Sequence, residues 1–125
     1  MASEIPGHYP QLATATSGGL TTGLLNDDVN YVVVTSASAN NFVTLPLASG
    51  YVGQVIRGSV GANGFKLTTP LGSATTINTV AVAGAIAGAA IPANSEWTAI
   101  RYSNTNWIVS SRTSAGAAGA TIVPA

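Results

Sequence analysis

The chain has 125 residues, which is enough for one domain with a modest hydrophobic core. Only 6% of its residues are charged, against about 25% in typical globular domains, and the formal net charge is zero. The few basic residues are scattered, which argues against nucleic acid as a partner, because phosphate neutralisation needs clustered Lys and Arg.

A surface with so few charges lacks the usual protection against self-association. We therefore expect much of it to be covered by copies of the same chain or by a partner protein. The alternative is a soluble monomer whose surface is made of Ser, Thr and Asn.

The composition also bears on redox chemistry and on membranes. The chain contains no cysteine, so it has neither disulfides nor thiolate chemistry. Its first ten residues include Glu4 and two prolines and lack a basic start, so we expect no signal peptide. The longest apolar stretch, residues 80–91, is shorter than the about 20 residues that span a bilayer, and we expect no membrane segment.

Residues 1–23 are predicted to form an extended N-terminal arm. Pro6 and Pro10 are incompatible with a helix interior, and Gly18-Gly19 would form a joint before the domain. The candidate partner-contact residues of this arm are Ile5, Tyr9 and Leu12.

Residues 24–112 are predicted to form a β domain, since helix formers are scarce and short runs of Val, Ile and Thr alternate with Gly, Asn and Ser. The apolar centre of residues 31–35 predicts a strand covered on both faces. Strands are also expected at residues 42–45, 54–60, 65–69 and 75–82. The segment Gly61-Ala-Asn-Gly64 predicts a hairpin between the strands at 54–60 and 65–69.

The last predicted hairpin joins residues 96–102 to residues 106–111. On its first strand Trp97, Ala99 and Arg101 share one face, and Thr98, Ile100 and Tyr102 share the other. We expect Ile100, Trp107 and Val109 in or near the core. Residues 113–125 form a predicted C-terminal arm, whose candidate contact residues Thr121, Ile122 and Val123 could add to the edge of a neighbouring sheet.

A search for catalytic, cofactor or metal sites yields no candidate residues. The single histidine, His8, lies in the predicted arm, and general acid–base catalysis needs titratable groups placed together. The acidic pair Asp27-Asp28 does not match a calcium loop and is better explained as a turn before the strand at 31–35. We therefore expect no enzyme activity and no cofactor.

Aromatic side chains suggest one further possibility. Trp97, Trp107, Tyr102 and Tyr31 could form a stacking platform for sugars, as in a carbohydrate-binding module. Aromatic residues on a β hairpin more often belong to the core or to a subunit interface, and we favour that interpretation.

A succession of short motifs runs along the predicted β domain. The motifs are Phe42-Val-Thr-Leu-Pro46, Gly50-Tyr-Val-Gly-Gln-Val-Ile56, Gly64-Phe-Lys-Leu-Thr68, Ile77-Asn78, Ile91-Pro-Ala-Asn94 and Asn106-Trp107. Together they cover most of the chain, from about Tyr31 to Ser111. This succession resembles small β modules of bacteriophage virion surface proteins, namely capsid decoration (cement) proteins and related tail-fibre modules.

This resemblance implies a small antiparallel β-sandwich or barrel-like module with extended N- and C-terminal arms, commonly trimeric and attached to a virion. The short length and the two arms favour a decoration subunit that binds the major capsid protein on the outside of the phage head and stabilises the capsid. Such a protein would be made in the host cytoplasm. A tail-fibre or receptor-binding subunit, or a carbohydrate-binding module, remains the alternative.

Overall fold

The computed structural model describes residues 10–17, 25, 29–46, 52–69, 75–81, 88–114 and 116. This part of the chain contains strands and turns and no helix. The strands are β1 (Gln11–Thr14), β2 (Tyr31–Thr35), β3 (Phe42–Thr44), β4 (Val55–Val60), β5 (Phe65–Thr68), β6 (Thr76–Ile77), β7 (Val80–Ala81), β8 (Ala89–Ile91), β9 (Ser95–Ser103) and β10 (Asn106–Thr113).

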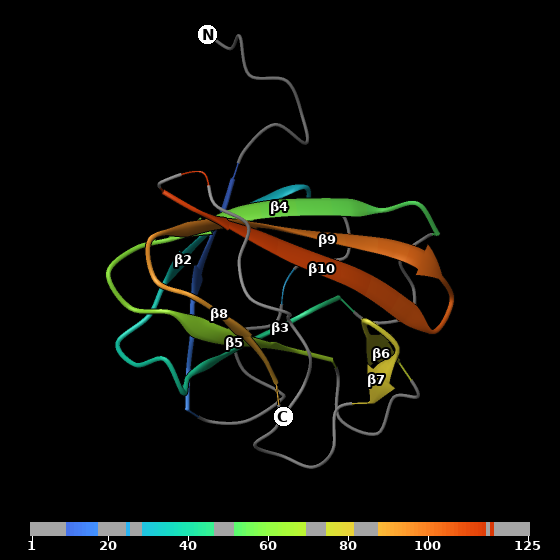
Figure 1. The fold of residues 1–125 in the computed structure, drawn as a ribbon, viewed down its shortest axis with the longest axis horizontal. Coiled ribbons are helices and arrows are strands. Elements are labelled where there is room, and N and C mark those ends of the chain that lie inside the picture. Colours follow the sequence, from blue (N-terminus) through green and yellow to red (C-terminus); the bar gives the residue numbers. More distant parts are fainter. Residues whose placement is uncertain are drawn as a thin grey trace, which may run out of the picture.

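The strands form two sheets that pack face to face as a small β-sandwich (Figure 1). The larger sheet has seven strands in the order β1-β2-β4-β9-β10-β6-β7, and the smaller has three in the order β3-β5-β8. The predicted all-β sandwich is therefore confirmed.

The chain alternates between the two sheets as it runs from β2 to β5. It leaves β2 in the larger sheet for β3 in the smaller one, returns to β4 beside β2, and crosses again to β5 beside β3. Both neighbouring pairs, β2 with β4 and β3 with β5, are therefore parallel, as is β1 with β2.

The expectation that the strands of this sandwich are antiparallel holds for only half of the strand pairs. Four of the eight strand pairs in the described residues are parallel, and the antiparallel pairs are β4 with β9, β9 with β10, β5 with β8, and β6 with β7. A chain that crosses to the opposite sheet and back runs in the same direction when it returns to the first sheet. The strands β2 and β4 are therefore parallel neighbours, and so are β3 and β5.

The predicted hairpin at Gly61–Gly64 is also wrong. The turn does not join two paired strands but carries the chain from β4 in one sheet to β5 in the other. Neither Asn63 nor Gly64 adopts a positive φ. Gly64 is needed for space, because a Cβ atom there would collide with the carbonyl oxygen of Ile91.

The N-terminal boundary of the domain lies earlier than residue 24. Strand β1 comes from the segment predicted to be an arm, and it pairs with β2 from Gln11 to Thr14. Ala13 and Ala15 are buried in the core, and Thr16 bridges to Phe42. The segment 10–17 is thus part of the sandwich. Residues 1–9 and 18–23 of the predicted arm lie outside the described residues.

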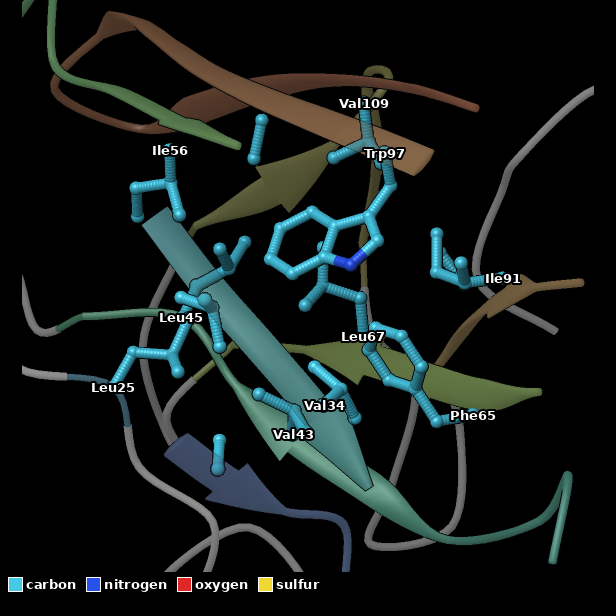
Figure 2. Packing of buried hydrophobic residues seen from close by; sticks show 14 of the residues in the cluster. Leu25, Val34, Val43, Leu45, Ile56, Phe65, Leu67, Ile91, Trp97 and Val109 are labelled. Atoms are coloured by element: carbon cyan, nitrogen blue, oxygen red, sulfur yellow. The ribbon is translucent and has the colours of Figure 1, made fainter. Parts of the chain in front are cut away.

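Apolar side chains from both sheets fill the space between them, with Trp97 near the centre (Figure 2). The Trp97 indole meets the Phe65 ring edge to face, with 5.7 Å between the ring centroids. Gly58 lies opposite Trp97 on β4, and a Cβ atom there would occupy the same space as the indole ring.

Trp107 and Val109 are buried as predicted, whereas the expected core residue Ile100 points to the other side of the sheet and is 37% exposed. Strand β2 is also covered on one face only, since Val32 and Val34 are buried and Tyr31 and Val33 are exposed. The outer face of the larger sheet therefore carries side chains that the sequence analysis placed inside.

Asn78 fixes the β6–β7 turn to the edge of β10. Its side-chain amide donates to the carbonyl of Val109 at 3.0 Å and accepts from the Val109 N–H at 2.9 Å. Asn78 adopts a φ of 50°, which asparagine tolerates better than most residues. Asn106 supports the same turn by accepting hydrogen bonds from the Thr79 N–H and from the hydroxyl of Thr76.

Candidate interaction surface

The outer face of the seven-stranded sheet is the most unusual surface of the described residues. Side chains alternate along each strand, so every second residue of β2, β4, β9 and β10 points away from the core. Seven of the nine exposed large hydrophobic residues lie on this face: Leu12, Tyr31, Val33, Val55, Ile100, Tyr102 and Ile108. We call these residues and their polar neighbours the outer sheet face.

Strand register places the apolar residues of this face in rows. Val55 pairs with Ile100, and Ile100 pairs with Ile108, so three aliphatic side chains stand side by side on β4, β9 and β10. On the β1 side, Leu12 pairs with Val33. Cross-strand apolar neighbours of this kind shield one another only from the sides, and their tips remain in contact with water.

The next row along these strands is mixed. Tyr31 pairs with Arg57, Arg57 pairs with Thr98, and Thr98 pairs with Ser110. These residues line part of a shallow depression of about 480 Å³. The sheet face therefore changes from aliphatic to polar along the strand direction.

Charges gather at the polar end of the outer sheet face. Glu96 on β9 pairs with Arg112 on β10, and Ser59 on β4 is the other neighbour of Glu96. Arg112 donates a hydrogen bond from Nη1 to the Gly116 carbonyl at 3.3 Å. With Arg57, three of the five charged side chains in the described residues lie on this one face.

The other two charged side chains serve local packing. Lys66 on β5 lies with its ammonium 5.9 Å from the centre of the Phe42 ring. Arg101 is 2% exposed on the inner side of β9, where it lies 5.9 Å from the Trp107 ring and donates from Nη2 to the Asn104 carbonyl at 3.1 Å. Arg101 is therefore withdrawn from the surface, whereas Lys66 is half-exposed on the outer side of the smaller sheet.

The sugar-stacking platform predicted as an alternative is not formed. Trp97 and Trp107 are each only 1% exposed, because both lie between the two sheets. Tyr102 and Tyr31 do reach the surface, but a sugar cannot stack on the buried indoles. The expected burial of Trp107 is thus confirmed, whereas the burial of Trp97 was not predicted, because the opposite face of its strand, that of Ile100, was expected in the core.

The candidate partner contacts in the arms lie mostly outside the described residues: Ile5, Tyr9, Thr121, Ile122 and Val123. The remaining one, Leu12, is 79% exposed on β1 at the border of the outer sheet face. It belongs to a strand of the domain and not to an arm.

His8, Asp27 and Asp28 also lie outside the described residues. Within the described part of the chain, no three His, Cys, Asp or Glu side chains gather into a group that could hold a metal ion. No helix there is long and apolar enough to cross a membrane.

A second hollow of about the same volume lies at the end of the sandwich. Its lining is apolar, and it is formed by Ala39, Ala62, Asn63, Gly64, Phe65, Ala90, Ile91, Pro92 and Ala93. It holds about 480 Å³ and contains no titratable side chain. It could accept an apolar group but offers only one polar side chain to orient it.

Comparison with protein families, with curated proteins and with solved structures gives no significant match. The chemistry of the outer sheet face is therefore the main guide to function.

Sequence reasoning missed this face because it placed Ile100 in the core. The alternation of Ile100 and Tyr102 with Ala99 and Arg101 was visible, but either set could have faced inwards. Val55 on β4 gave no independent signal, since the neighbouring Ile56 is equally apolar.

Proposed function

We propose that this chain is a structural subunit of a protein assembly, with no enzyme activity, and that it binds neighbouring protein subunits through the outer sheet face. The observation that carries this proposal is the concentration of seven exposed large apolar residues on one face of the larger sheet. Exposed apolar area of this kind in a protein with few charges marks a surface that another protein covers.

The assembly that we propose is a bacteriophage virion, and this step rests on the motif resemblance. In that virion the chain would act as a decoration subunit on the outside of the head, bound to the major capsid protein and associated with its own copies. Buried area at each contact would then raise the heat or force needed to open the shell.

Shell binding provides a direct test. Purified shells that lack the protein should lose resistance to heat and regain it when the purified chain is added back. The variant Ile100→Glu should not restore resistance, because it places a charge in the aliphatic row. The control variant Val80→Glu changes an equally exposed residue, also 37%, on the opposite side of the sheet, and it should restore resistance.

Unchanged heat resistance of shells without the protein would reject the decoration role. A tail-fibre or receptor-binding subunit is the alternative within the virion, and antibody labelling of particles in the electron microscope distinguishes head from tail.

A further inference from the structure

We infer that the occupant of the outer sheet face is a second copy of the same chain, related to the first by a two-fold axis that runs between β9 and β10, parallel to both strands. This inference rests on the proposed function, because it names the neighbour that covers the β9–β10 part of the proposed surface. It is carried by the pattern of charged, polar and apolar residues on the β9–β10 hairpin.

The hairpin is self-complementary under such an axis. The axis lies above the outer sheet face, midway between β9 and β10. Rotation by 180° about it lays β9 of one copy over β10 of the other. Each outward residue of β9 then faces, on the partner copy, the same β10 residue with which it is paired in its own chain. The residues matched across the interface are therefore the same pairs that are cross-strand neighbours within one chain.

Three outward pairs follow from that register. Glu96 of one copy faces Arg112 of the other, which brings opposite charges together. Thr98 faces Ser110, which allows hydrogen bonds between hydroxyl groups. Ile100 faces Ile108, which buries an aliphatic pair. Because the interface is isologous, each of these contacts occurs twice.

Other placements of the axis match less well. An axis between β4 and β9 would set Arg57 against Thr98 and Ser59 against Glu96, and each of these charges would lack an opposite charge. With the axis between β9 and β10, Arg57 lies at the rim, where it keeps its hydration. Charge complementarity thus selects the hairpin.

The size of the face sets the expected strength. Under this axis only β9 and β10 of the two copies lie directly over one another, and two strands about 4.8 Å apart with three rows of outward residues give a planar area of roughly 10 Å by 20 Å. This is smaller than the about 800 Å² that each partner buries in a standard interface. Stacked sheets also cross at about 30°, so the rows match best near the axis. We therefore expect a dimer that dissociates on dilution.

The test is the mass of the full chain in solution, measured by sedimentation over a range of concentrations. The wild-type chain should approach the dimer mass as concentration rises. Ile100→Glu should remain a monomer, and the control Val80→Glu should dimerise like the wild type. Circular dichroism of each variant verifies that the fold is retained.

Charge reversal tests the predicted facing pair. Glu96→Arg gives a hairpin with two positive charges, and Arg112→Glu gives one with two negative charges. Each variant alone should be a monomer, because like charges face each other. An equimolar mixture should form a dimer of one copy of each, because opposite charges then meet across the interface. Repulsion within one hairpin cannot produce this rescue.

The outcomes separate this inference from the proposed function. A wild-type chain that stays a monomer, or that forms a trimer, overturns the two-fold contact, and so does a mixture of the charge variants that fails to associate. If the same chain still restores heat resistance to shells, the proposed function stands without the two-fold contact. If it forms the dimer but has no effect on shells, the inference stands and the decoration role fails.

Discussion

The close approach of Gly58 to Trp97 leads to the most demanding prediction about stability. Gly58→Ala adds a single methyl group, and its carbon would lie 2.7 Å from Nε1 of the indole and closer still to two ring carbons. The ring cannot withdraw easily, since it is 1% exposed and rests against Phe65. The methyl group must therefore displace the indole or separate β4 from β9.

The expected cost follows from two opposing effects. Overpacking of a close-packed core costs about 1–3 kcal/mol. Replacing glycine by alanine where the backbone permits it returns about 0.4–1 kcal/mol by restricting the unfolded chain. The net loss of unfolding free energy should be about 1–2 kcal/mol, which lowers the melting temperature of a domain of this size by roughly 3–10 °C.

Thermal unfolding at one fixed protein concentration measures this cost, because association would otherwise shift the midpoint. Gly61→Ala is the matched control, since a Cβ atom at that exposed turn meets nothing within 4 Å and should leave the midpoint nearly unchanged. In a Trp97→Leu background the smaller side chain leaves room, and Gly58→Ala should cost almost nothing there. An equal cost in both backgrounds would refute the steric explanation.

Three further predictions concern the turn, the first strand and the tryptophans. Asn78→Ala should lower the unfolding free energy by about 2–3 kcal/mol in urea titrations, because the variant loses two hydrogen bonds to β10 and places alanine at a positive φ. A decrease of less than about 0.5 kcal/mol would contradict these two hydrogen bonds. Ala13→Glu should destabilise the domain strongly in the same titration, whereas Leu12→Glu should be tolerated, since only Ala13 is buried. Equal effects of the two variants on the unfolding free energy would mean that β1 lies outside the core. Trp97 and Trp107 should fluoresce with blue-shifted emission and resist quenching by iodide, and added sugars should not change the spectrum; efficient quenching would mean that the indoles reach solvent.

The strand content and most strand positions could be predicted from the sequence. Val, Ile and Thr runs bounded by Gly, Asn and Pro identify the strands, because those residue types constrain the backbone locally. The final hairpin was predicted to within a few residues for the same reason, since its two strands are joined by a two-residue polar turn and contact each other directly.

The assignment of strands to sheets could not be predicted in this way. Asn63-Gly64 resembles a hairpin turn, but the function of Gly64 is to let the chain pass the carbonyl of Ile91, which is distant in sequence. Only the folded structure reveals this contact. Local turn chemistry therefore indicated that the chain changes direction without indicating which strand it joins next.

The orientation of β9 illustrates a second limit. Side chains alternate with a period of two, so a strand with apolar residues in both phases has two possible core faces. The inner face of β9 contains Arg101 and the outer face contains Ile100, which is the reverse of what hydrophobicity alone predicts. Which face of β9 turns inwards is decided by Trp97, whose indole fills the space left by Gly58. This packing depends on the neighbouring strand β4 and cannot be read from the sequence of β9 alone. The same ambiguity concealed the candidate interaction surface.

The winding of the chain between two sheets also determines how the protein can fold. Gln11 pairs with Val32, Tyr31 with Arg57, and Val55 with Ile100, so most of the larger sheet joins residues far apart in the sequence. Loops must close before such contacts form, and proteins dominated by them fold in milliseconds to seconds. The β9–β10 hairpin closes over a much shorter loop, so it can form early and offer the edge on which β4 and then β2 assemble.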